Sequence, residues 1–227
     1  MNTVWSRVAA AVVLPATLAS ALSVVPGTSS LTAVVVGAAT VAHAADGAGG
    51  GVASRGAAAE LRAGVFDPPR MAPDFRLSAS DGSELTLSRY RGKVVILYFG
   101  FTSCPAVCPT TLATLAKTRK ELGEQAGDVQ VVYVTVDPAK DTAERMREYL
   151  AGFDPTFIGG TGSAEVLESV RGEYGILAAK DASGLYSHSS STVLIDRAGR
   201  LRALMPYGRE PDDYVHDLRI LLAEPAA

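Results

Sequence analysis

A continuous apolar run at residues 94–99, Val-Val-Ile-Leu-Tyr-Phe, constrains the fold of this chain more than any other feature of its sequence. A strand without alternation of polar and apolar residues has to be covered on both of its faces. Residues 129–136 form a second run of this buried type. Such strands lie at the centre of a sheet that carries helices on both sides, so the sequence predicts an α/β fold.

The remaining elements alternate in a way that narrows this fold class. A turn signal, Ser-Asp-Gly at 80–82, separates two short apolar segments and predicts a small β-hairpin. Strands and helices then alternate until an antiparallel pair and a closing helix complete the domain. This order fits a thioredoxin-like fold with a mixed central sheet flanked by helices and an extra N-terminal β-hairpin. The helices are expected at 110–125, 142–150, 164–174 and 212–222, and the further strands at 157–158, 192–195 and 201–205.

The first 45 residues have the character of an export segment. Arg7 is their single formal charge, and an apolar stretch follows it at residues 8–25. A stretch of about 18 residues suits the apolar region of a signal peptide and is close to the minimum length for a transmembrane helix. Residues 42–44, Ala-His-Ala, match a small-x-small cleavage pattern. A cleaved signal peptide and a retained anchor in the inner membrane both stay open, and both place the rest of the chain in the periplasm or at the cell surface.

Residues 46–64 are expected to form a flexible linker, and residues 65–227 to form the folded domain. The linker segment is rich in Gly and Ala and offers little apolar surface to bury. The domain that remains, roughly 160 residues, has a suitable length for a single hydrophobic core.

The charge distribution and the motifs argue against several classes of function. The formal net charge is -3, and Lys and Arg are scattered along the chain, so we expect no nucleic-acid partner. The sequence contains no Gly-rich phosphate-binding loop, no Gly-x-Ser-x-Gly motif and no pair of histidines at helical spacing. Nucleotide-binding, serine-hydrolase and helical zinc sites are therefore disfavoured.

The chain has two cysteines, Cys104 and Cys108, which lie together shortly after the first buried run. A pair this close cannot cross-link distant segments, and ligands of open α/β sheets gather beyond the carboxyl ends of the strands. We therefore expect local chemistry at this turn. Pro105 and Pro109 predict an irregular turn with a helix that starts near Cys108, and the amide groups and dipole of that helix favour the thiolate form.

The spacing of the cysteines bears on their chemistry. Three residues separate them, whereas thioredoxin-type redox enzymes have two. In a helix, positions four apart hold their Cβ atoms about 5–6 Å apart, but a disulfide needs roughly 3.5–4.5 Å. The spacing thus suits a shared metal ion at least as well as a disulfide, and both stay open. Two thiolates favour a soft ion, Cu(I) ahead of zinc, over magnesium or calcium.

The predicted domain contains two histidines. His216 lies on the closing helix, and we expect a solvated surface residue there. His188 precedes the strand predicted at 192–195, in a loop that faces the cysteine turn in thioredoxin-like folds. Residues 190–196, Ser-Ser-Thr-Val-Leu-Ile-Asp, lack the proline that thiol–disulfide enzymes of this fold usually have here. We therefore expect His188 to join the cysteines as a metal ligand, and its imidazole would let the site hold Cu(II) as well as Cu(I).

Two motifs together with the distant histidine resemble the Sco/SenC family of copper proteins, which assist the assembly of cytochrome c oxidase. The motifs are Tyr-Phe-Gly-Phe-Thr-Ser-Cys-Pro-Ala-Val-Cys-Pro at 98–109 and Val-Thr-Val-Asp-Pro-Ala-Lys-Asp at 134–141. The likeness extends from about Met71 to the C-terminus. The combination of the cysteine motif and the histidine is more specific than either alone.

The resemblance implies a site and a partner. It implies copper ligation by Cys104, Cys108 and His188, and delivery of copper or reducing equivalents to the dinuclear copper centre of oxidase subunit II or to another copper acceptor protein. Asp137 resembles an acidic residue that the family keeps near the site; alternatively, it only ends a strand and caps the turn that follows. Lys140 departs from the family, in which arginine is common at this position.

Two functions stay open at this point. The first is a metallochaperone, which is not an enzyme and passes copper to its partner by ligand exchange. The second is a thiol–disulfide oxidoreductase, with Cys104 and Cys108 as its catalytic pair, that keeps the copper-binding cysteines of subunit II reduced. The missing proline and the three-residue spacing favour the chaperone. A peroxiredoxin-like site is disfavoured because its usual Thr and Arg partners are not evident.

Overall fold

The computed structural model describes residues 60–182 and 186–225 of the chain. The predicted signal or anchor segment, and residues 46–59 of the predicted linker, lie outside the described residues. Within the described ranges, no helix is both long enough and apolar enough to cross a bilayer.

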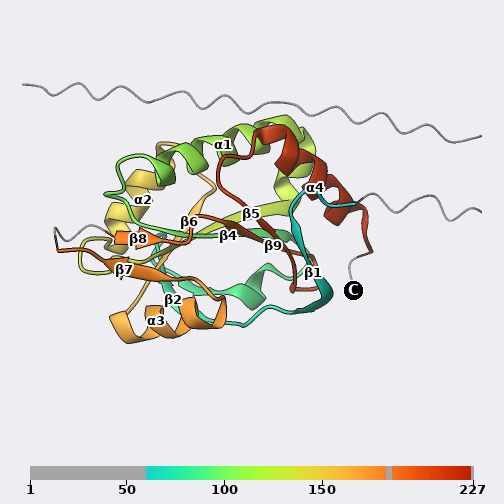
Figure 1. Cartoon of the computed structure of the whole chain (residues 1–227). Coiled ribbons are helices and arrows are strands. Elements are labelled where there is room, and N and C mark those ends of the chain that lie inside the picture. The colour runs from blue at the N-terminus through green and yellow to red at the C-terminus, as the bar shows by residue number, and fades with distance from the viewer. Residues whose placement is uncertain (1–59, 183–185, 226–227) are drawn as a thin grey trace, which may run out of the picture. The chain divides into compact units, whose positions relative to one another are not determined.

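An eight-stranded mixed sheet forms the centre of the domain (Figure 1). Its fourth strand, β4, pairs in parallel with β5 and antiparallel with β9, and all seven of its residues are buried. The uniformly apolar run at 94–99 therefore lies in the middle of the sheet, and the predicted mixed sheet is confirmed. The strands follow the order β1 (Gly64–Met71), β10 (Arg200–Met205), β9 (Thr192–Ile195), β4 (Val94–Gly100), β5 (Val129–Thr135), β6 (Ile158–Thr161), β2 (Arg76–Ala79) and β3 (Glu84–Thr86).

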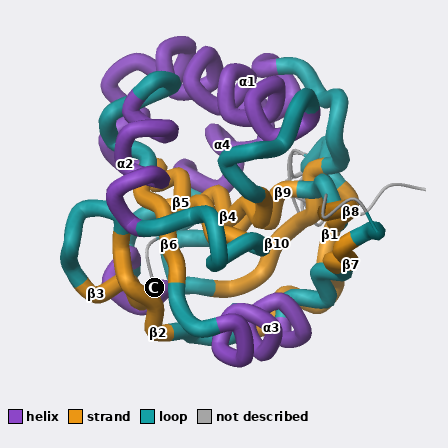
Figure 2. The backbone as a smooth tube through the Cα atoms, turned by 90° about the vertical axis from the view of Figure 1, so that its left-hand side faces the viewer, coloured by secondary structure: helices purple, strands orange, loops and turns teal. Residues whose placement is uncertain are grey.

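Helices cover both faces of this sheet. Figures 1 and 2 show α1, α2 and α4 on one face and α3 on the other. The side chains of Thr142 and Ser163 accept hydrogen bonds from backbone N–H groups in the first turns of α2 and α3, and these caps fix where the two helices begin. The helices are α1 (Val107–Leu122), α2 (Ala143–Ala151), α3 (Ala164–Glu173) and α4 (Pro211–Ala223), and two 3-10 helices are η1 (Leu87–Tyr90) and η2 (Gly123–Asp128).

The predicted N-terminal hairpin is confirmed as β2 and β3, and three further strands were not predicted. β2 also pairs with β6, so the hairpin extends the main sheet. β1 pairs with β10 at the opposite edge, and its residues are almost all exposed. Two short strands, β7 (Ala178–Lys180) and β8 (Tyr186–His188), form a separate two-stranded sheet in the segment expected to be a loop.

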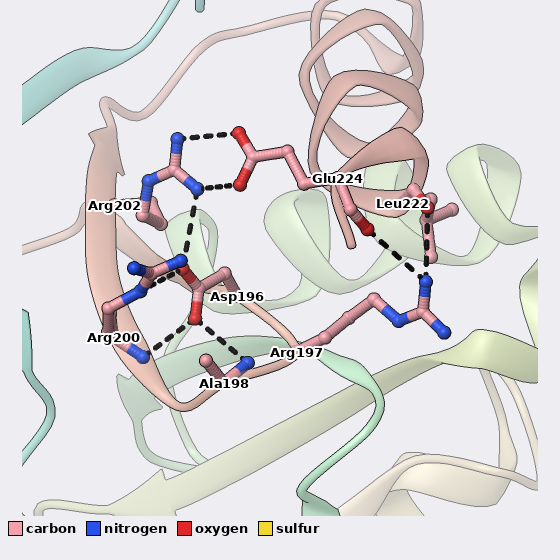
Figure 3. Close-up of polar contacts among 7 residues, drawn as sticks. All are labelled: Asp196, Arg197, Ala198, Arg200, Arg202, Leu222 and Glu224. Carbon is pink, nitrogen blue, oxygen red and sulfur yellow. Dashed lines mark hydrogen bonds and ion pairs between the residues drawn. The ribbon is translucent and has the colours of Figure 1, made fainter. Parts of the chain in front are cut away.

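Side-chain hydrogen bonds and ion pairs join the turn between β9 and β10, and the start of β10, to the end of α4 (Figure 3). The buried Asp196 carboxylate accepts hydrogen bonds from two backbone N–H groups of the turn, at 2.8 and 3.0 Å, and from the side chain of Arg200 at 2.8 Å. Gly199 has a φ of +82°, a conformation that favours glycine. Arg202 forms ion pairs with both Asp196 and Glu224, the residue that follows α4. The predicted antiparallel pair is confirmed, and the aspartate of the Asp-Arg-Ala-Gly turn between its strands also helps to fix the closing helix.

Candidate metal centre

Both cysteines lie beyond the carboxyl end of β4, as the sequence predicts. β4 ends at Gly100 and α1 begins at Val107, so Cys108 lies in the first turn of that helix and Cys104 in the irregular turn before it. Cys108 is completely buried, whereas Cys104 is partly exposed, and both are free thiols. The pair therefore has one sulfur in the core and one toward the surface.

The start of α1 directs an amide group at the outer sulfur. Backbone N–H groups in the first turn of a helix have no partner within the helix. The N–H of Cys108 donates to Cys104 Sγ at 3.5 Å. This contact holds the Cys104 sulfur at the helix N-terminus, where amide groups and the helix dipole stabilise negative charge.

His188 brings an imidazole to the same place from 80 positions further along the chain. Its Nε2 lies 3.5 Å from Cys108 Sγ. Its Nδ1 lies 2.8 Å from the carbonyl oxygen of Ser189, and because a carbonyl oxygen only accepts hydrogen bonds, Nδ1 carries the proton. In the neutral form of this ring the lone pair is then on Nε2, the atom that approaches the cysteine.

The imidazole ring is held by its strand and by aromatic neighbours. His188 is the last residue of β8 and pairs with Ala178 of β7, so a strand stands where the sequence predicted a loop. The Phe101 ring meets the imidazole edge-on, with centroids 5.8 Å apart, and the Tyr98 ring lies at 6.4 Å. The ring orientation is therefore set by packing on two sides.

Cys104 and His188 face one cavity of about 240 Å³. Within the described ranges, no three Cys, His, Asp or Glu side chains are already gathered closely enough to hold an ion. The contact between His188 and Cys108 is in place, and Cys104 lines the same cavity as His188, so two sulfurs and one nitrogen lie in this region. These donors suit Cu(I), Cu(II) or zinc rather than a hard ion. The rest of the cavity wall is mostly apolar: Phe101, Pro105, Ala106, Val107, Tyr186, Ser187 and Ser190.

Asp137 lies two residues beyond β5 and is buried. Its Oδ1 has no hydrogen-bond partner among the described residues, and its Oδ2 lies 4.0 Å from Lys140 Nζ. Its backbone carbonyl accepts hydrogen bonds from the N–H groups of Lys140 and Asp141. These are the contacts of a residue that closes the turn after a strand, and a role for its carboxylate behind the cysteines and His188 stays a prediction.

Asp141, to which the sequence alone assigned no role, anchors the turn that carries Cys104. Its buried carboxylate accepts hydrogen bonds from the backbone N–H of Thr102 at 3.0 Å, from the Thr102 hydroxyl at 2.6 Å and from the Thr135 hydroxyl at 2.7 Å. Arg145 lies 3.9 Å from this carboxylate and also donates to the Thr102 hydroxyl at 2.6 Å. Asp141, the last residue of the motif at 134–141, thus fixes Thr102 at the beginning of the turn that carries Cys104.

His216 belongs to a different part of the domain. Its Nδ1 lies 2.9 Å from the completely buried carboxylate of Asp217 on α4. Asp217 also accepts hydrogen bonds from the backbone N–H groups of Arg62 and Ala63, just before β1. The prediction of a solvated surface residue is incomplete: the His216 side chain is 33% exposed, and its ring is also bound to a buried carboxylate.

Gly100, the last residue of β4, leaves the space that the Cys108 sulfur occupies. A Cβ at this position would lie 2.5 Å from Tyr133 Oη and 2.9 Å from Cys108 Sγ. We expect Gly100→Ala to lower the free energy of unfolding by about 1–3 kcal/mol, because both neighbours are held in a packed core. Urea denaturation measures the change. Gly127→Ala is the matched control, because no described atom lies within 4 Å of the Cβ added there. Equal stability of Gly100→Ala and the wild type would contradict this account of the packing.

Known proteins match this chain in sequence and in fold. The family model described as SCO1/SenC matches residues 65–223. An SCO2-like protein of Rickettsia conorii is 31% identical over 159 residues, which are 67% of this chain and 78% of that protein. The solution structure of apo Sco1 from Thermus thermophilus is 34% identical with a TM-score of 0.67, over 74% of this chain and 100% of that one. Copper-bound ScoI of Bradyrhizobium japonicum is 31% identical with a TM-score of 0.61, over 67% and 99% of the two chains.

The comparisons agree with the architecture. The solved relatives share the mixed sheet flanked by helices, so the predicted thioredoxin-like fold is confirmed. The matched region contains all three residues of the candidate site, Cys104, Cys108 and His188. This chain belongs to the SCO1/SenC family.

Proposed function

We propose that this chain is an extracytoplasmic copper metallochaperone that assists the assembly of the dinuclear copper centre of cytochrome c oxidase. The observation that carries the proposal is the approach of His188 Nε2 to 3.5 Å from Cys108 Sγ, with Cys104 facing the same cavity as the imidazole. Membership in the SCO1/SenC family supports copper as the metal, because solved relatives from Bradyrhizobium japonicum and yeast have copper bound.

In this proposal one copper ion binds to each chain, through Cys104, Cys108 and His188. The ion is the cargo that the chaperone delivers and not a permanent cofactor. Two thiolates suit Cu(I), and a neutral imidazole nitrogen extends the site to Cu(II). Metal-ligating histidines usually donate their other ring N–H to a fixed acceptor, and the Ser189 carbonyl supplies that acceptor to His188. Asp137, whose Oδ1 is unpartnered among the described residues, remains the candidate for an acidic group close behind the ligands.

The unequal burial of the two sulfurs supports a direction for copper transfer. Cys104 lines the cavity, whereas Cys108 lies in the core. A thiolate of the acceptor protein would therefore reach the copper ion from the Cys104 side and bind before the Cys104 sulfur leaves. Each copper–sulfur bond that breaks is replaced by another, so this exchange requires neither an oxidant nor a reductant.

The proposed acceptor is subunit II of cytochrome c oxidase or another copper-binding protein. Residues 1–45, as a signal peptide or as an inner-membrane anchor, would deliver the domain to the periplasm or the cell surface. A solved relative from Bacillus anthracis str. Ames, 27% identical, is described as a lipoprotein, which supports an exported domain held at a membrane.

A second function, thiol–disulfide oxidoreductase, is supported by the partly exposed free thiol of Cys104 beside that of Cys108. The Cys104 thiolate would attack a disulfide of the partner, form a mixed disulfide and release one partner thiolate. Cys108 would then attack the Cys104 sulfur, release the second partner thiolate and leave a disulfide within this chain, so two electrons pass to the partner. His188 has no obligatory part in this chemistry.

Copper titration of the folded domain tests the proposal. We expect one copper ion per wild-type chain with strong thiolate-to-copper charge-transfer absorption, and more than about 100-fold weaker binding by Cys104→Ser and by Cys108→Ser. His216→Ala is the matched control and should bind copper like the wild type. Reduction of a model disulfide by the metal-free domain measures the second function. If the wild-type domain binds no copper but reduces the disulfide, the metallochaperone function is overturned and the thiol–disulfide oxidoreductase function takes its place.

A further inference from the structure

Three tyrosine hydroxyls are buried without a hydrogen-bond partner among the described residues: those of Tyr98 on β4, Tyr133 on β5 and Tyr149 on α2. Their rings form a continuous row, with centroids 5.6 Å apart between Tyr98 and Tyr133 and 6.4 Å apart between Tyr133 and Tyr149. The side chains of Tyr98 and Tyr133 are completely buried. A buried hydroxyl without a partner carries a desolvation cost of about 1–3 kcal/mol, so two such groups side by side require an explanation.

The Tyr133 hydroxyl lies beside the Cys108 sulfur, and the Tyr98 ring packs against the rings of both Tyr133 and His188, with centroids 5.6 and 6.4 Å apart. The Tyr133 hydroxyl and Cys108 Sγ flank the same point, because a Cβ on Gly100 would be 2.5 Å from the first and 2.9 Å from the second. A tyrosine hydroxyl keeps its proton at neutral pH, so both groups remain hydrogen-bond donors.

A charged Cys108 sulfur needs hydrogen-bond donors, whereas the two tyrosine hydroxyls lack acceptors among the described residues. Its sulfur is completely buried, and a buried thiolate is unfavourable unless donors or cations surround it. The Cys108 backbone N–H is directed at the other sulfur, that of Cys104. His188 Nε2, 3.5 Å from this sulfur, is a copper ligand in the proposed site and so donates no hydrogen bond to the sulfur in the copper-bound protein. The Tyr133 hydroxyl is a donor that lies beside this sulfur, and it can stabilise a charge there.

We infer that Tyr98 and Tyr133 are positioning residues that donate hydroxyl hydrogen bonds to the Cys108 thiolate in the copper-bound protein. The inference rests on the proposed function, since copper binding is what displaces the thiol proton to solvent. In the metal-free thiol form the two hydroxyls have no strong acceptor. In the thiolate form each O–H gains a charged acceptor and the sulfur gains two donors, so Cys108 becomes the retained ligand while Cys104 exchanges.

The charge-transfer spectrum reports these hydrogen bonds directly. A hydroxyl that donates to a thiolate stabilises the sulfur lone pair, and hydrogen bonding around a cysteine ligand tunes the electronic properties of its copper ion. Removal of a donor raises the energy of the lone pair. Less energy is then needed to transfer an electron from sulfur to Cu(II), so the absorption band moves to lower energy.

The test uses Tyr133→Phe and Tyr98→Phe, which remove the hydroxyls and keep the rings. We expect each variant to bind copper roughly 10- to 100-fold more weakly than the wild type, with the charge-transfer band at lower energy. The metal-free variants should unfold at the same temperature as the metal-free wild type or at a higher one, because they lose only an unpaired buried hydroxyl. A merely structural hydroxyl would not combine weaker copper binding with an undiminished apoprotein stability.

Tyr174→Phe is the matched control, because this buried tyrosine donates to the Pro73 carbonyl at 2.6 Å, away from the cysteines. We expect it to lower the unfolding temperature of the metal-free protein by about 2–4 °C and to leave copper affinity and spectrum unchanged. Wild-type affinity and spectrum in both Tyr98→Phe and Tyr133→Phe would overturn the inference, as would loss of apoprotein stability in both. A wild-type domain that binds no copper would instead overturn the proposed function.

Discussion

Replacing His188 by alanine is expected to abolish the Cu(II) form of the protein while Cu(I) still binds. Cys104 and Cys108 remain in this variant, and two thiolates are a sufficient ligand set for the softer Cu(I) ion. Cu(II) loses its only nitrogen donor of the proposed set, the Nε2 atom that lies 3.5 Å from Cys108 Sγ. We expect affinity for Cu(II) to fall by more than about 100-fold, measured from the thiolate-to-Cu(II) charge-transfer band, whereas the Cu(I) affinity falls far less.

The cavity beside His188 allows a sharper version of this experiment. His188→Gly leaves an opening next to a cavity of about 240 Å³ that Cys104 also lines, so free imidazole can enter. Addition of imidazole should restore the charge-transfer band in His188→Gly but not in Cys108→Ser. His216→Ala retains His188 and should resemble the wild type throughout. Intact Cu(II) binding by His188→Ala would remove the imidazole from the ligand set.

The centre of the fold could be predicted because buried strands have a distinctive composition. Residues 94–99 and 129–136 lack polar alternation, and they became β4 and β5 in the middle of the sheet. The edges could not be predicted in this way. β1 contains Pro68 and Pro69, which argue against a strand, but an edge strand with irregular pairing between Val65 and Arg70 tolerates them. β7 and β8 are only three residues each, and none of these residues is fully buried.

The ligand candidates were visible in the sequence, whereas the residues that support them were not. Cysteine and histidine carry distinctive chemistry, so Cys104, Cys108 and His188 could be grouped from the sequence alone, and the fold brings His188 to Cys108. Asp141 and Tyr133 are common residue types whose importance comes from a contact. Asp141 reaches a threonine 39 positions earlier in the chain, and nothing in the local pattern indicates that pairing.

Asp141→Ala is expected to lower the free energy of unfolding by about 3–5 kcal/mol. The substitution leaves the Thr102 N–H and two threonine hydroxyls without the carboxylate that accepts from all three, in a region where Thr102 and Thr135 are buried. Asp141→Asn should lower the free energy of unfolding by a smaller amount, because the amide keeps one oxygen acceptor. The loss is not zero, since the N–H₂ group then faces a hydroxyl that has to donate. Urea denaturation of the metal-free domain measures both variants.

The same variant also tests the link between this carboxylate and the metal site. Thr102 begins the turn that holds Cys104, so loss of its anchor should loosen the turn and weaken copper binding as well as stability. Asp81→Ala is the matched control: Asp81 likewise accepts from a backbone N–H and a hydroxyl, both of Ser83, but it is exposed and remote from the cysteines. It should leave copper affinity unchanged and stability nearly so. If Asp141→Ala unfolds like Asp81→Ala, the buried carboxylate does not anchor the turn, and the rigidity of the cysteine segment must come from its prolines and the start of α1.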